Sequence, residues 1–157
     1  MMRRNEFEKL TAESFEQLPQ WVREKIKNVA LLVDDKPSPE VRRRERLGRN
    51  HTLLGYYQGI PLSVRGEHYG VGPTMPDTIT LYQIPIEETA ADKLGLHDLD
   101  LRNPNLGSRN PKYREILKQI IAETIWHEFA HHFGMGEKAV RDRERQKRSG
   151  QRRKPIV

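Results

Sequence analysis

The sequence predicts one domain that contains both helices and strands. Residues 29–33, 53–57 and 78–84 are short runs with the β-branched and aromatic composition of strands. Residues 111–133 form a longer segment whose second half is apolar on nearly all sides, which predicts a helix that runs through the core. With 157 residues, the chain is long enough for one domain with a core and too short for two.

Two helices are expected before the first strand. Residues 6–18 carry apolar side chains at helical spacing, and Pro19 can open a second helix that continues to about Lys27. After the first strand, Ser38 and Pro39 have the pattern of an N-cap and a first helical residue, starting a brief helix that ends at Gly48. The side chains expected to point inward from the first two helices are Phe7, Leu10, Phe15, Leu18, Trp21, Val22 and Ile26.

The middle of the chain is expected to be less regular. The run at 29–33 should be a buried strand, whereas Pro85, at the end of 78–84, favours an edge position for that strand because proline lacks an N–H. Residues 90–110 contain Asn103, Pro104 and Gly107 and are expected to form a long excursion with at most a short turn. A last helix is expected at about 137–147.

Composition narrows the class of protein. Hydrophobic residues make up 35% of the chain and charged residues 32%, which is typical of a soluble domain with a modest core. No apolar run approaches the roughly 18–20 residues that a membrane span needs, and no apolar signal segment follows Met1. We therefore expect a cytoplasmic protein without a membrane partner.

The absence of cysteine restricts the chemistry further. It excludes disulfides, a thiol nucleophile and thiolate metal sites. A transition metal in this protein would have to use His and carboxylate ligands, the pattern of catalytic zinc sites.

The net charge of +6 raises the possibility of a nucleic-acid partner. Much of the excess is local, because residues 138–154 contain nine Lys or Arg and residues 42–46 contain four Arg. The simpler interpretation is a solvated helix face and tail. No aromatic residues alternate with the charges of the tail, so the stacking expected of a single-strand binder is missing there.

The most informative stretch is His127-Glu128-Phe129-Ala130-His131, which opens the pattern H-E-x-x-H-x-x-G-x-x-E. On a helix, His127 and His131 lie on one face about a turn apart, so that two ring nitrogens can converge on one zinc ion. Glu128 then stands where it can act as a base on a water molecule. The competing interpretation is an ordinary helix with two surface or core histidines and an exposed Glu128.

A third metal ligand must come from beyond the helix. Glu137 cannot reach the histidine face on a straight helix, so the chain has to turn back at Gly134. The spacing from Gly134 to Glu137 matches the metzincin pattern and makes Glu137 the first candidate. Glu144 is the alternative, in a thermolysin-like arrangement, and Glu137 could also simply cap the last helix.

With this motif the sequence resembles the minimal zincin-like metallopeptidases of bacteria, which are built around H-E-x-x-H-x-x-G-x-x-D. The resemblance covers most of residues 5–145 and includes a helical segment that ends in Leu18-Pro19, the strand at 29–33, Gly55-Tyr56-Tyr57 and residues 76–82. Two features depart from the family. Glu137 stands where Asp is usual, and residues 90–110 are longer than usual.

The resemblance implies an α+β fold, a small zincin-like core with a mixed β-sheet packed on a buried active-site helix that carries HExxH. Residues 1–140 would form the metallopeptidase domain, and residues 141–157 a basic helix end and tail, partly disordered. His127, His131 and Glu137 would bind Zn²⁺, Glu128 would be the catalytic base, and the strand near Thr80 would border the cleft.

The function expected from these observations is hydrolysis of peptide bonds in a peptide or protein substrate, by water activated on zinc with Glu128 as base. The peptide could pair with the edge of residues 78–84. Candidates for a second oxyanion donor are His68, Tyr69 and Tyr82. The alternatives are a catalytically silent, zinc-bound binding or regulatory module, and a basic nucleic-acid-associated protein. The sequence does not predict the oligomeric state.

Overall fold

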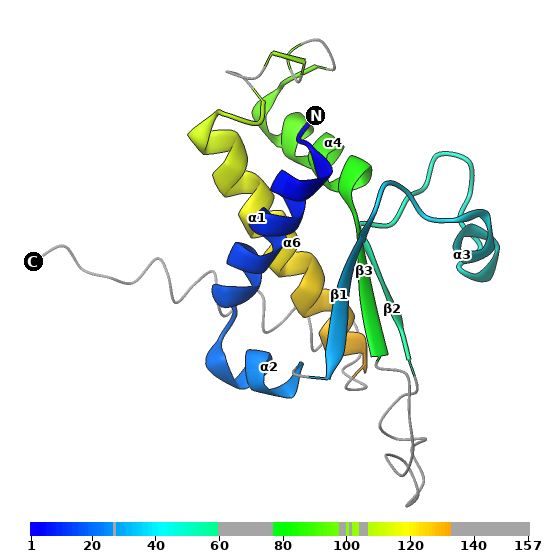
Figure 1. Cartoon of the computed structure of the whole chain (residues 1–157). Helices are drawn as coiled ribbons and strands as arrows, with labels where there is room; N and C mark the ends of the chain where they lie inside the picture. The colour runs from blue at the N-terminus through cyan, green and yellow to red at the C-terminus, as the bar shows by residue number, and fades with distance from the viewer. Residues whose placement is uncertain (27, 60–76, 98–99, 101, 104–106, 133–157) are drawn as a thin grey trace, which may run out of the picture.

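The computed structural model describes the chain except for residues 27, 60–76, 98–99, 101, 104–106 and 133–157. In the described part, helices cover one face of a three-stranded sheet (Figure 1), which confirms the α+β class. None of the helices in this part is long and apolar enough to cross a membrane. The elements are α1 (Arg4–Glu16), α2 (Gln20–Lys25), β1 (Val29–Asp34), α3 (Pro39–Arg44), β2 (Gly55–Gln58), β3 (Asp77–Tyr82), α4 (Gln83–Leu94) and α6 (Pro111–His132).

The sheet is mixed, as expected, but its strand order was not predicted. β3 lies in the centre, with β1 parallel to it on one side and β2 antiparallel to it on the other. The edge position expected for residues 78–84 is therefore wrong. The strand ends at Tyr82, and Pro85 belongs to the first turn of α4, where the missing proline N–H has no helical partner to lose.

The two faces of the sheet differ in burial. Ile79 and Leu81 of β3 are fully buried on the face that meets the helices, whereas Thr78 and Thr80 on the opposite face are half-buried. On β1, Leu32 is 47% exposed, so the expectation of a wholly buried first strand is wrong. β1 lies at the edge of the sheet, and only one of its faces is covered. Because successive side chains of a strand point to opposite faces, such a strand can bury at most every second side chain.

Helix α6 is the centre of the core, and α1, α4, β2 and β3 all pack against it (Figure 1). This is the core helix expected at 111–133, although Phe133 lies outside the described residues. It is apolar on several sides because it has neighbours on several sides. The fully buried side chains that it contributes are Tyr113, Leu117, Ile121 and Ile125, together with Ala130.

The two N-terminal helices are observed as α1 and α2, and Val22 and Ile26 are buried as expected. Trp21 is the exception, because 45% of it is exposed. Its ring lies across that of Trp126 on α6, with the ring centroids 5.6 Å apart and the planes at 84°. The indole thus covers the surface end of the core without entering it.

Two further boundaries differ from expectation. Ser38 caps α3 through its hydroxyl, which accepts a hydrogen bond of 3.2 Å from the N–H of Val41, but the helix ends at Arg44 and does not reach Gly48. The excursion expected from residue 90 begins later, because α4 continues to Leu94. It stops there at Gly95, whose positive φ of 65° is a left-handed helix end that glycine adopts without strain.

Candidate active site

The motif occupies the last described turns of α6, where the helix leaves the core. Phe129 and Ala130 are buried, while His127 and His131 are exposed. The helix is thus buried along most of its length, but it presents the two imidazoles at the surface. Their spacing of four residues puts both histidines on one outward face of the helix, while Phe129 and Ala130 lie on the inward face.

The two histidine rings converge. Their Nε2 atoms are 3.0 Å apart and the ring centroids 4.5 Å apart. Two nitrogens that bind one tetrahedral zinc ion at the usual bond lengths lie about 3.3 Å from each other. The donor set therefore fits zinc, since two imidazole nitrogens meet at about the spacing that a shared ion requires.

The described part of the chain contains no group of three His, Asp or Glu side chains that could complete a metal site with this pair. Glu137, the first candidate for the third ligand, lies outside the described residues. So do Gly134, at which the chain is expected to turn, and the alternative ligand Glu144. The domain boundary expected at residue 140 also falls outside the described residues.

Glu128 points toward the sheet. Its Oε2 accepts a hydrogen bond of 3.0 Å from the backbone N–H of Tyr57 on β2. Burial raises the pKa of the Glu128 carboxyl above its usual value, and the Tyr57 N–H and the charges of His127 and His131 partly oppose this rise. A half-buried carboxyl with a raised pKa, whose Oε2 is held by a main-chain N–H, suits a group that must gain and lose a proton.

Gly55 permits this contact. A methyl group at Gly55 would lie 2.7 Å from Cγ2 of Thr124 and 3.2 Å from Cγ of Glu128. Strand β2 can therefore approach α6 closely enough for Tyr57 to reach Glu128 only because residue 55 lacks a side chain. The sequence did not predict this role of Gly55, because the role depends on how closely β2 lies against α6 in the fold.

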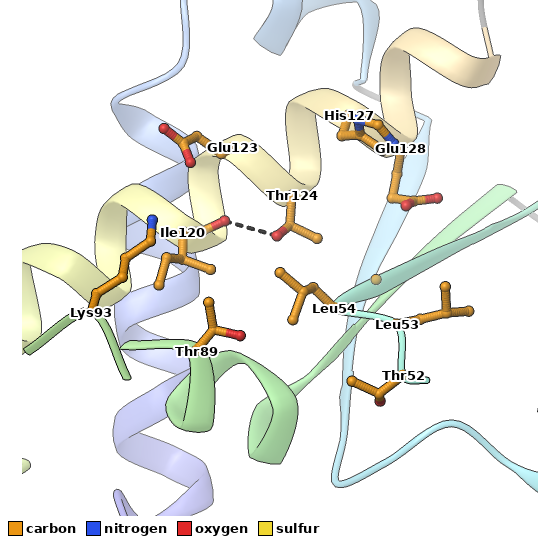
Figure 2. A pocket seen from close by; sticks show the side chains of 11 residues that line it. Thr52, Leu53, Leu54, Thr89, Lys93, Ile120, Glu123, Thr124, His127 and Glu128 are labelled. Carbon is orange, nitrogen blue, oxygen red and sulfur yellow. Dashed lines mark hydrogen bonds between the residues drawn. The ribbon is translucent and has the colours of Figure 1, made fainter. Parts of the chain in front are cut away.

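A pocket of about 350 Å³ opens beside the motif. It begins at His127 and Glu128 and runs back along α6 toward α4, with the chain before β2 as its other wall (Figure 2). Lys93 and Glu123 are its charged residues apart from the motif. The remaining lining residues are Thr52, Leu53, Leu54, Gly55, Thr89, Ile120 and Thr124.

One of the three candidate oxyanion donors lies in the described part of the chain. Tyr82 is 2% exposed, and its pKa is raised to about 12, mainly by burial and further by nearby negative groups that include Glu128. The phenol therefore stays protonated at neutral pH. His68 and Tyr69 lie outside the described residues.

Residues 26–99 match the model of a known family, described as zincin-like metallopeptidase. The match covers slightly less than half of the chain and supports the zincin-like metallopeptidase family. No curated protein matches the chain. Members of a zincin-like metallopeptidase family are hydrolases that normally bind zinc, so the match supports the same class for this chain.

The zincin-like segment includes β1, α3, β2, β3 and α4 and ends before α6. The family match and the HExxH motif therefore come from different parts of the sequence. In the structure these parts meet, because Tyr57 inside the matched segment donates its hydrogen bond to Glu128 outside it.

Proposed function

We propose that this zincin-like chain is a zinc-dependent metallopeptidase that hydrolyses peptide bonds. The observation that carries the proposal is the convergence of the His127 and His131 ring nitrogens beside the Glu128 carboxylate, at the mouth of a pocket. The family match of residues 26–99 supports the same class of activity.

The metal would be held by His127, His131 and, as third ligand, Glu137. When bound, zinc would supply an open coordination position for water and polarise the substrate carbonyl group. Two imidazoles and a carboxylate are the ligand types that a chain without cysteine can offer.

Glu128 is the proposed general base. Its Oε2 is fixed by the Tyr57 N–H, and no donor within the described residues holds Oε1, which can take a proton from the attacking water. The same carboxyl group then passes that proton to the amine that leaves when the peptide bond breaks. Its raised pKa favours the first transfer, because the carboxylate of a weaker acid accepts a proton more readily.

The substrate is expected along β2 and not along residues 78–84, since β3 is paired on both sides. Within the described residues, the outer edge of β2 carries no strand. A peptide that pairs antiparallel with this edge would pass Glu128 near Tyr57, and its residues after the cleaved bond would run toward Leu54. They would then enter the pocket, whose inner wall is made of leucine, isoleucine and threonine side chains.

The test compares Glu128→Gln with Glu115→Gln, a matched change at an exposed position on the same helix. Glu128→Gln should keep zinc, measured by metal analysis, and lose hydrolysis of a mixed peptide library by about 10²–10⁴-fold. Glu115→Gln should keep both. Loss of zinc in Glu128→Gln would make Glu128 a ligand, and full activity in that variant would exclude it as the base.

The nucleic-acid alternative receives less support. Of the arginines in residues 42–46, Arg42 donates hydrogen bonds to the carbonyl groups of Gly48 and His51, and Arg44 contacts Glu40 and Tyr56. Two of the four guanidinium groups are thus already used within the chain. The basic residues of 138–154 lie outside the described residues.

A further inference from the structure

The pocket beside the motif carries a charged residue that the proposed reaction does not use. Lys93 lies in the last turn of α4 and lines the pocket together with Ile120 and Glu123 of α6. Figure 2 shows its side chain extending toward α6, at the opposite end of the pocket from His127. The pocket therefore connects the proposed metal site with an ammonium group.

This ammonium group has no partner within the part of the chain that the structure describes. No hydrogen bond or ion pair there includes Lys93. Glu123, by contrast, accepts a hydrogen bond of 2.9 Å from Gln119, and its side chain points away from Leu54 in Figure 2. The positive charge at this end of the pocket is therefore available to a ligand.

The threonines that the two helices bring to the pocket are already bonded. The hydroxyl group of Thr89 donates to the carbonyl oxygen of Pro85, and that of Thr124 donates to the carbonyl oxygen of Ile120, both at 2.8 Å. Each hydroxyl proton is thus used within its own helix. Among the described side chains at this end of the pocket, Lys93 is the one that can donate to an anionic group.

The length of the pocket determines where such an anionic group would lie on a substrate. Ile120 precedes His127 by seven residues, which is about 10 Å along a helix with a rise of about 1.5 Å per residue. An extended peptide covers about 3.3 Å per residue. A peptide whose cleaved bond lies at the metal site would therefore bring its first three residues after that bond within reach of Lys93.

We propose that Lys93 binds a carboxylate group of the substrate, carried within the first three residues after the cleaved bond. This inference rests on the proposed peptidase function and names the class of peptide that the site selects. The carboxylate belongs either to an Asp or Glu side chain or to the C-terminus of the peptide, since an ammonium group pairs with both in the same way. Lys93 determines specificity in this arrangement and touches no reacting atom.

The first experiment sequences the products that the zinc-loaded protein releases from a mixed peptide library with a free C-terminal carboxylate, and from the same library with a C-terminal amide. Cuts that have a carboxylate within the next three residues should be enriched about 2–5-fold. Enrichment of Asp or Glu in both libraries identifies the side chain as the source. Enrichment of cuts near the C-terminus in the first library alone identifies the terminal carboxylate. Cleavage with neither enrichment, or with a preference for Lys or Arg, would overturn the proposal.

The variants compare Lys93→Met with Lys112→Met, a matched change at an exposed lysine of α6 that does not line the pocket. Lys93→Met should lose the enrichment, and Lys93→Glu should replace it with a preference for Lys or Arg at the same positions. Lys112→Met should keep the enrichment. A lysine in the last turn of a helix also complements the helix dipole, but that role alone would alter the melting temperature and leave the enrichment unchanged. Enrichment that persists in Lys93→Met would contradict the proposal.

A binding measurement separates this proposal from the proposed function. The zinc-loaded Glu128→Gln protein is titrated by NMR with leucyl-alanyl-alanine, with its C-terminal amide, and with the C-terminal amide of leucyl-alanyl-glutamic acid. Leucine comes first because leucine and isoleucine line the pocket. At least one of the two peptides that carry a carboxylate should bind about 2–5-fold more tightly than the neutral peptide and shift the amide signals of Thr89 and Lys93.

This advantage should shrink in about 0.5 M salt and disappear when Lys93→Met is added to Glu128→Gln. Carboxylate-dependent binding by a protein whose unaltered form hydrolyses no peptide would support the role of Lys93 and contradict the peptidase function. Hydrolysis by the unaltered chain, together with equal binding of all three peptides, would support the peptidase function and overturn the role of Lys93.

Discussion

The backbone N–H of Tyr57 donates a 3.0 Å hydrogen bond to Oε2 of Glu128, across 71 positions of sequence. This bond joins the zincin-like segment to the helix that carries the motif. Since the donor is a main-chain group, no substitution of Tyr57 other than proline removes it. What controls the bond is the distance between β2 and α6, and that distance depends on Gly55 and Thr124.

Gly55→Ala should lower the hydrolytic rate by about 10-fold or more while zinc is retained. The new methyl group would overlap Cγ2 of Thr124 and push β2 away from Glu128, at a strain cost of about 1–3 kcal/mol. Turnover of a peptide substrate and metal content measure the two effects separately.

Thr124→Ser provides the rescue, because it removes the methyl group that the new side chain would meet at 2.7 Å. The double variant should recover part of the activity that Gly55→Ala loses. Gly48→Ala is the matched control, since a methyl group there would contact only the ring of the exposed His51. If Gly55→Ala were as active as the unaltered chain, Gly55 would have no part in positioning Glu128.

His131→Ala should lose zinc and melt at a lower temperature, because one of two converging ligands is removed. Metal analysis and a thermal melt with and without added zinc measure this. His97→Ala, on the loop after α4, should leave zinc content unchanged. Stoichiometric zinc in the His131→Ala protein would contradict the proposed ligand pair.

Glu137→Ala should weaken zinc binding strongly, while Glu144→Ala should not. Glu137→Asp should have a milder effect, since it shortens the side chain by one methylene group within a turn flanked by glycines. If Glu137 only caps a helix, its removal should cost about 1 kcal/mol of stability and leave zinc affinity unchanged. Zinc titrations of the three variants separate these cases, and loss of affinity in Glu144→Ala alone would favour the thermolysin-like arrangement.

Thr89→Trp should narrow the pocket from the side of α4 and shift the substrates cleaved toward smaller residues after the broken bond. The expected result is a raised KM for peptides with a large residue there, with little change for those with alanine or glycine. Sequencing the products of a mixed peptide library measures the shift. The same substitution at the exposed neighbour, Glu88→Trp, should leave the preference unchanged, and an equal shift in both variants would exclude the pocket as the cause.

Short-range patterns in the sequence predicted most of the helices and strands, and they placed the HExxH motif on a helix. The cap at Ser38, the apolar spacing of α1 and the apolar run of α6 are short-range signals, and each was observed close to its expected place. The family resemblance is confirmed for residues 26–99. The proposed roles of His127, Glu128, His131 and Glu137 stay predictions.

What could not be predicted depends on pairing between distant segments. Pro85 predicts an edge strand, yet it lies in the first turn of α4, and no local signal distinguishes these cases. Trp21 is expected inside with Val22 and Ile26 on the second helix, although 45% of it is exposed and it covers the core from outside. The contacts from Gly55 to Thr124 and from Met2 to Glu87 arise only when strands and helices far apart in sequence meet.

The contact between Trp21 and Trp126 bears on the intrinsic tryptophan fluorescence of the protein. These are the two tryptophans of the sequence, and Trp126 immediately precedes His127. Nearly all of the intrinsic fluorescence of the protein therefore originates at the end of α6 that carries the motif. A metal ion that draws the rings of His127 and His131 together would alter the surroundings of this indole pair. The emission spectrum can thus follow a zinc titration of the unlabelled protein, without any substrate.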